Sequence, residues 1–69
     1  MNSMTRIDAQ KLIFKQAKNL TNALPKGSMV YIHWKNGSPV VLPEKEKGYG
    51  VITSVRLESI LNKQFWLVA

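Results

Sequence analysis

The side chains best suited to chemistry fall in one short stretch, residues 29–35. Tyr31, His33 and Lys35 alternate there, so a strand would present all three on one face. An aromatic ring can stack on a nucleic-acid base and a lysine can pair with a phosphate. An imidazole can serve as a general base, so His33 is the one candidate for metal-independent RNA cleavage. The stretch predicts contact with nucleic acid, although a sheet face half covered by a helix or a partner would look the same.

A second group of cations is spaced for a helix. Lys11, Lys15 and Lys18 would share one helical face with Asn22, and no acidic residue lies between the three lysines. We expect this face to contact phosphates, with Lys26 adding to it; the alternative is a solvated helix back. The net charge of +6 and the pI near 10.0 favour an anionic partner, either nucleic acid (RNA favoured) or an acidic protein.

Composition excludes several kinds of site. The chain has no cysteine, which removes disulfides, thiolate nucleophiles and cysteine-ligated zinc. Its single histidine excludes a multi-histidine metal site within one chain, so we expect no metal and no cofactor. The carboxylates show no pairing typical of general acid–base catalysis; they are Asp8, Glu44, Glu46 and Glu58. The sequence leaves open whether the chain is an enzyme, although the lack of a carboxylate pair argues against it.

The helix that positions the lysines is predicted over residues 5–24. Its apolar residues recur at helical spacing. Thr5 or Ser3 can cap its start, and Asp8 falls in the first turn, where the helix dipole favours an anion. Pro25, with a glycine two residues later, is expected to end it.

The stretch that holds His33 is predicted to be the first strand of a hairpin. Residues 29–35 read as one strand, Asn36 and Gly37 as a type I′ turn, and residues 38–43 as the returning strand. A two-residue loop places Lys35 opposite Ser38 and fixes every other pair. One face of this hairpin is assigned to the core and holds Val30, Ile32, Trp34 and Val41; the other holds Met29, Tyr31, His33, Lys35, Val40 and Leu42.

Two prolines predict where the hairpin lies in its sheet. Pro39 and Pro43 fall in pairs that do not exchange hydrogen bonds, so their missing N–H groups would have pointed away from residues 29–35. The strand over residues 38–43 should therefore be a sheet edge. Any further strand should pair with the free side of residues 29–35.

The last segment allows two interpretations. A helix over residues 54–64 is favoured, because it places Leu57, Ile60 and Leu61 on one face. Alternatively, residues 55–61 form a strand and residues 64–68 another. The expected fold is therefore a single small α+β domain, residues 1–69, with an N-terminal helix, an antiparallel sheet and a C-terminal helix; the alternative is a helix with a four-stranded antiparallel sheet.

Several short motifs carry a family resemblance. They are Gly27-Ser28-Met29, Asn36-Gly37, Val40-Val41-Leu42-Pro43 and Leu57-Glu58-Ser59-Ile60-Leu61. In these motifs the chain resembles the HicA family of mRNA interferase toxins. The resemblance implies a double-stranded-RNA-binding-like α-β-β-β-α fold, contact with RNA and an antitoxin partner.

The chain departs from that family at the catalytic position. The family's histidine would fall at Met29, whose thioether can neither take nor give a proton. His33 lies four residues further along the same strand face, about 13 Å away at 3.3 Å per residue, too far to replace it in the same substrate pose. The resemblance therefore implies a toxin-like RNA binder without the usual catalytic histidine.

The chain end supports a different hypothesis. Phe65 and Trp66 lie in an apolar C-terminal run, and aromatic residues at a chain end either close the core or anchor an interface. The alternative to a nucleic-acid-binding module is thus a protein-interaction or homodimerising accessory protein of a phage or mobile element. The N-terminus has no signal-peptide pattern and no apolar run approaches a membrane span, so we expect a cytoplasmic protein with no membrane partner.

Overall fold

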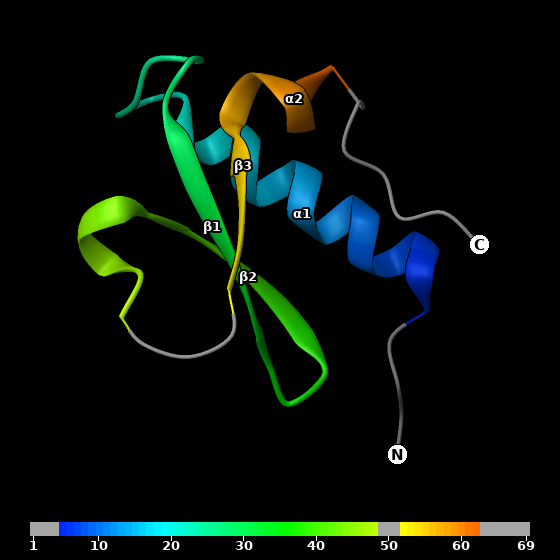
Figure 1. Cartoon of the computed structure of the whole chain (residues 1–69). Helices are drawn as coiled ribbons and strands as arrows, with labels where there is room; N and C mark the ends of the chain where they lie inside the picture. The colour runs from blue at the N-terminus through cyan, green and yellow to red at the C-terminus, as the bar shows by residue number, and fades with distance from the viewer. Residues whose placement is uncertain (1–4, 49–51, 63–69) are drawn as a thin grey trace.

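The computed structural model describes residues 5–48 and 52–62. Its elements follow the order α1 (Arg6–Leu20), β1 (Met29–Lys35), β2 (Ser38–Pro43), the 3-10 turn η1 (Glu44–Glu46), β3 (Ile52–Arg56) and α2 (Leu57–Leu61). Figure 1 shows α1 lying across one side of the sheet, with α2 following directly on β3. The expected α+β class, with an N-terminal helix, an antiparallel sheet and a short C-terminal helix, is confirmed.

The first helix starts where the sequence predicts and ends earlier. The Thr5 hydroxyl accepts a hydrogen bond from the Asp8 N–H at 3.1 Å, which caps the first turn. The helix ends at Leu20 rather than at residue 24. The Thr21 hydroxyl donates to the Lys18 carbonyl at 2.6 Å, in competition with backbone bonding. Pro25 also disfavours helical geometry at the residue before it.

The hairpin matches its prediction in turn type and register. Asn36 and Gly37 both have positive φ, 51° and 81°, as a type I′ turn requires. Lys35 pairs with Ser38, and the remaining β1–β2 pairs follow without a bulge. The fixed turn therefore decides which side chains of β1 face the helix.

The segment after residue 51 corrects the favoured helix over residues 54–64. Residues 52–56 form β3, which pairs antiparallel with β1, and the helix begins only at Leu57. Ile52, Thr53 and Val55 are β-branched and suit a strand. The sheet has the order β2-β1-β3, so the proline argument is confirmed: β2 is an edge and the third strand occupies the free side of β1. In the described ranges the sheet has three strands.

The core lies between α1, α2 and one face of the sheet. It is built from Ile13 and Ala17 of α1, from the sheet residues Val30, Ile32 and Val41, and from Leu57 and Ile60 of α2. Trp34, which was assigned to this core, is 41% exposed. It stands one residue from the turn, at the end of β1 beyond the core residues, and its cross-strand neighbour Pro39 is buried in its place.

Gln16 joins α1 to the outer side of β2. Its Nε2 donates to the Pro39 carbonyl and its Oε1 accepts from the Val41 N–H, both at 3.0 Å. The side-chain amide thus bonds to the strand as a neighbouring strand would. This contact fixes α1 against the edge of the sheet.

The second helix is capped by a distant loop. Leu57 N–H donates to the Ser28 carbonyl at 2.9 Å, and Glu58 N–H donates to the Lys26 carbonyl at 2.8 Å. The Arg56 side chain also donates to the Gly27 carbonyl, at 3.2 Å. Three successive carbonyls before β1 therefore hold the β3–α2 junction in place. Within the described ranges, neither helix has the length and apolar character to cross a membrane.

Candidate nucleic-acid interface

The outer side of α1 carries the lysine face, defined as Lys11, Lys15 and Lys18. All three are exposed, whereas Ala9, Ile13 and Ala17 are the buried residues of the helix. At 100° per residue the three lysines fall within about 60° of one another, on the side away from the sheet. Lys18 lies seven positions after Lys11, so the face extends along about 10 Å of helix axis at 1.5 Å per residue.

No described carboxylate neutralises the lysine face. Lys18 Nζ lies 5.8 Å from the centroid of the Phe14 ring, which leaves its charge in place. Among the residues that the structure describes, none of the three lysines forms an ion pair. Asp8, the nearest acid in sequence, lies one turn before Lys11 on the same side of the helix, but it forms no ion pair with a described lysine. The face is therefore available to external anions.

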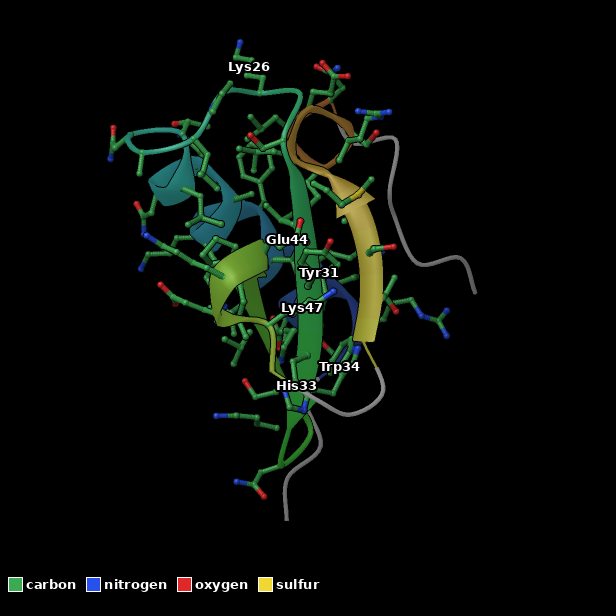
Figure 2. The ribbon with its side chains drawn as sticks, turned by 60° about the vertical axis from the view of Figure 1, so that its left-hand side comes forward. Lys26, Tyr31, His33, Trp34, Glu44 and Lys47 are labelled. Atoms are coloured by element: carbon green, nitrogen blue, oxygen red, sulfur yellow. The ribbon has the colours of Figure 1, made fainter. Side chains whose placement is uncertain are left out.

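The open face of the sheet holds a second arrangement, centred on Tyr31. Tyr31 Oη donates to Glu44 Oε1 at 3.3 Å, and Lys47 Nζ lies 4.8 Å from the centroid of the tyrosine ring. Figure 2 shows Glu44 and Lys47 over Tyr31, in front of β1. The turn η1 positions both charged residues because it begins directly after β2, the strand paired with β1.

This arrangement changes what Tyr31 offers to a ligand. A stacked base needs a free ring face, and Lys47 already occupies a cation–π position over the ring. A base could stack on that side only after the ammonium group moves away. Tyr31 and Lys47 therefore present a cation rather than a bare aromatic surface, next to the Glu44 carboxylate that already accepts from the tyrosine hydroxyl.

His33 lies on the same open face, nearer the turn (Figure 2). It is half-buried, and its cross-strand neighbours are Val40 and Ile52. In the described part of the chain no carboxylate bonds to the imidazole. His33 therefore lacks, among those residues, the partner that would orient it as a general base. The described contacts therefore give a catalytic role of His33 no support, and its contact with nucleic acid stays a prediction.

The predicted binding residues do not form one surface. α1 covers the sheet face that holds Val30 and Ile32, whereas Tyr31, His33 and Lys35 alternate with them and lie on the opposite face. The lysine face points away from the sheet altogether. Lys26 stands in the loop before β1, at the far end of that strand from His33 in Figure 2. A single ligand strand would therefore meet the lysine face or the open sheet face.

Sequence reasoning missed two residues of the open face. Glu44 and Lys47 follow the predicted hairpin, and no spacing signal in the sequence points to their contact with Tyr31. Phe65 and Trp66 lie outside the described residues, so their assignment as interface residues stays a prediction.

A shallow groove of about 320 Å³ runs beside β2. Its walls are mostly apolar, and only Lys45 and Glu46 add charge; the lining residues are Leu20, Ala23, Leu24, Val41, Pro43, Lys45 and Glu46. Within the described ranges, no group of three or more histidine, cysteine or acidic residues gathers to hold a metal ion. The groove therefore lacks the convergent polar groups of a catalytic pocket.

Comparison with known proteins adds no further assignment. No protein-family model, no curated protein and no solved structure matches the chain.

Proposed function

We propose that the protein is a small basic nucleic-acid-binding module that contacts phosphates through the lysine face of α1. The observation that carries the proposal is the placement of Lys11, Lys15 and Lys18 on one exposed side of a helix, without a carboxylate partner in the described chain. The face spans about 10 Å, a length along which one strand of a duplex places about three phosphates at 3.4 Å each. The spacing of the cations thus suits a phosphate backbone.

RNA is the favoured partner of this module. The support is the resemblance of its motifs to toxin-like RNA binders, together with the open sheet face, where Tyr31, His33 and Lys47 could contact a ribose or an unpaired base. The role proposed is binding. Met29 stands where that family has its catalytic histidine, and His33 has no orienting carboxylate among the described residues.

The test is a fluorescence-anisotropy titration against labelled single- and double-stranded RNA and DNA across a salt series. Each phosphate contact contributes about 0.9 to the slope of log affinity against log salt for a duplex, and about 0.7 for a single strand. Replacing Lys11, Lys15 and Lys18 together by glutamine should therefore reduce the magnitude of the slope by about 2–3. Between 50 and 200 mM salt, three duplex contacts correspond to an affinity loss of roughly 40-fold.

A matched variant separates the two faces. Replacing the exposed Lys26, Lys35 and Lys45 by glutamine removes the same number of positive charges, but from positions outside α1. We expect this variant to keep the larger part of the salt slope, while the lysine-face variant loses binding without losing its circular dichroism spectrum. Equal affinity of the lysine-face variant and the wild type would refute the proposal. A greater loss in the control variant would move the interface to the other surfaces.

A further inference from the structure

The two edges of the sheet differ in what they offer to another strand. In the β1–β2 ladder the pairs that exchange hydrogen bonds alternate from the turn, so the backbones of Pro39, Val41 and Pro43 face outward. Both prolines lack an N–H, and the Val41 N–H is bonded to Gln16. The β2 edge therefore has no free donor with which to accept an added strand.

The β3 edge has no such protection in the described chain. β1 bonds to β2 through residues 31, 33 and 35, so Val30 and Ile32 bond to Val55 and Thr53 of β3. The backbones of residues 52, 54 and 56 then face outward. Ser54, at the centre, is exposed, and the strand contains no proline, lysine or bulge. Its one charged side chain, Arg56, lies at the end of this five-residue strand and donates to the Gly27 carbonyl. Figure 2 shows β3 at the side of the sheet away from β2.

We infer that the β3 edge pairs with β3 of a second copy of this chain. The outward residues 52, 54 and 56 are symmetric about Ser54, so two antiparallel β3 strands can meet on a twofold axis that passes between the two Ser54 residues. These residues exchange both backbone hydrogen bonds, and Ile52 stands opposite Arg56 of the second copy. The surface is self-complementary, as a twofold interface requires.

The side chains on this edge favour a copy of the same strand. The small Ser54 side chains meet at the axis, where two hydroxyls can bond across the strands. The two Arg56 residues fall at opposite ends of the pairing, four residues apart along the strand, about 13 Å at 3.3 Å per residue. That separation exceeds the screening length of about 8 Å at physiological ionic strength.

The closed β2 edge determines where the assembly stops. Of the two edges of the described sheet, one can accept a strand, so pairing ends at two chains and joins their described strands into a six-stranded sheet. Because the twofold axis is perpendicular to the sheet, both copies of α1 lie on the same side of it. The pairing does not depend on nucleic-acid binding. Strand pairing alone buries little surface, so the dimer is expected to be weak and dependent on concentration.

A cysteine cross-link tests the register directly, because the native chain has no cysteine. In a hydrogen-bonded antiparallel pair the two Cα atoms at position 54 lie about 5.5 Å apart, within the disulfide range of about 4.4–6.8 Å. Ser54→Cys should therefore form a disulfide-linked dimer on mild oxidation. Thr53→Cys is the matched control: it is also exposed, but it points to the other face and meets its copy diagonally at about 7–8 Å. Equal cross-linking at both positions would refute the register.

Sedimentation equilibrium of the full chain tests the dimer itself. The wild type and Ser54→Ala should associate with rising concentration. Ser54→Lys, which places two like charges face to face, and Ser54→Pro, which removes the outward N–H, should stay monomeric; the lysine variant carries the test if the proline variant unfolds. Added salt should strengthen the dimer by screening the +6 charge of each chain, the opposite of its effect on nucleic-acid binding. A wild type that stays monomeric, with β3 amides protected by its own chain, would overturn the inference, as would a dimer that survives Ser54→Lys.

Discussion

Replacing Gln16 by alanine should destabilise the domain far more than its position on a largely exposed helix indicates. The substitution removes both bonds between α1 and β2, from Nε2 to the Pro39 carbonyl and from the Val41 N–H to Oε1. A typical intramolecular hydrogen bond contributes about 0.5–1.5 kcal/mol, and leaving a buried donor unsatisfied costs about 1–3 kcal/mol. Both bonds are part-buried, so we expect a loss of about 2 kcal/mol.

That loss converts into a large change in melting temperature because the chain is short. An unfolding entropy of about 2.1 cal/mol/K per residue, over 69 residues, gives about 0.14 kcal/mol/K. A loss of about 2 kcal/mol then lowers Tm by about 14 °C. The measurement is thermal unfolding followed by circular dichroism, together with hydrogen exchange at the Val41 amide.

Two control variants make the result specific. Lys15→Ala changes an exposed neighbour and should leave Tm almost unchanged. Gln16→Glu keeps the acceptor for the Val41 N–H but places a carboxylate beside the Pro39 carbonyl, so its Tm should fall between wild type and Gln16→Ala. A Gln16→Ala protein that melts within about 3 °C of wild type, with the Val41 amide still protected, would refute this account of the α1–β2 contact.

Two further substitutions test the core and the turn. Leu57 is fully buried, so Leu57→Ala should cost about 2–5 kcal/mol and leave much of this small domain unfolded at 37 °C, as urea titration would show; a midpoint close to wild type would mean that α2 is not part of the core. Gly37 has φ 81° and open space around a Cβ, so Gly37→Ala should cost about 1–2 kcal/mol through backbone strain alone. Gly27→Ala, where a Cβ also meets nothing within 4 Å and φ is not in the left-handed region, should be neutral in the same titration. Equal effects at both glycines would contradict the strain argument.

The parts of the fold set by local geometry were predictable from sequence. The Asn36-Gly37 turn determined the β1–β2 register, and the positions of Pro39 and Pro43 in that register placed β2 at the edge and the third strand beside β1. The position of helix α1 was predictable because its apolar spacing is regular. Its end was not, because it depends on the bond from the Thr21 hydroxyl to the Lys18 carbonyl and on the effect of Pro25 on the residue before it.

The parts that depend on tertiary contact were not predictable in the same way. The periodicity favoured a helix over residues 54–64 and also allowed a strand over residues 55–61. The outcome, a strand followed at once by a short helix, depends on the free side of β1 and on carbonyls at Lys26 and Ser28. The candidate site shows the same limit. Lys11, Lys15 and Lys18 were placed correctly on one exposed helix face, but the contact of Lys47 with Tyr31 follows from where η1 lies, which no residue spacing reveals.

The capping of α2 by the loop before β1 has a consequence for when the chain can complete its core during synthesis. A five-residue helix is far too short to persist alone, so it forms only when residues 26–28 are already in place to receive its first N–H groups. Leu57 and Ile60, two of the largest fully buried side chains, reach the core only at that moment. A nascent chain that has produced α1 and the hairpin thus exposes an unfinished apolar surface. Prematurely released fragments of this length should be degraded by cellular proteases rather than accumulate.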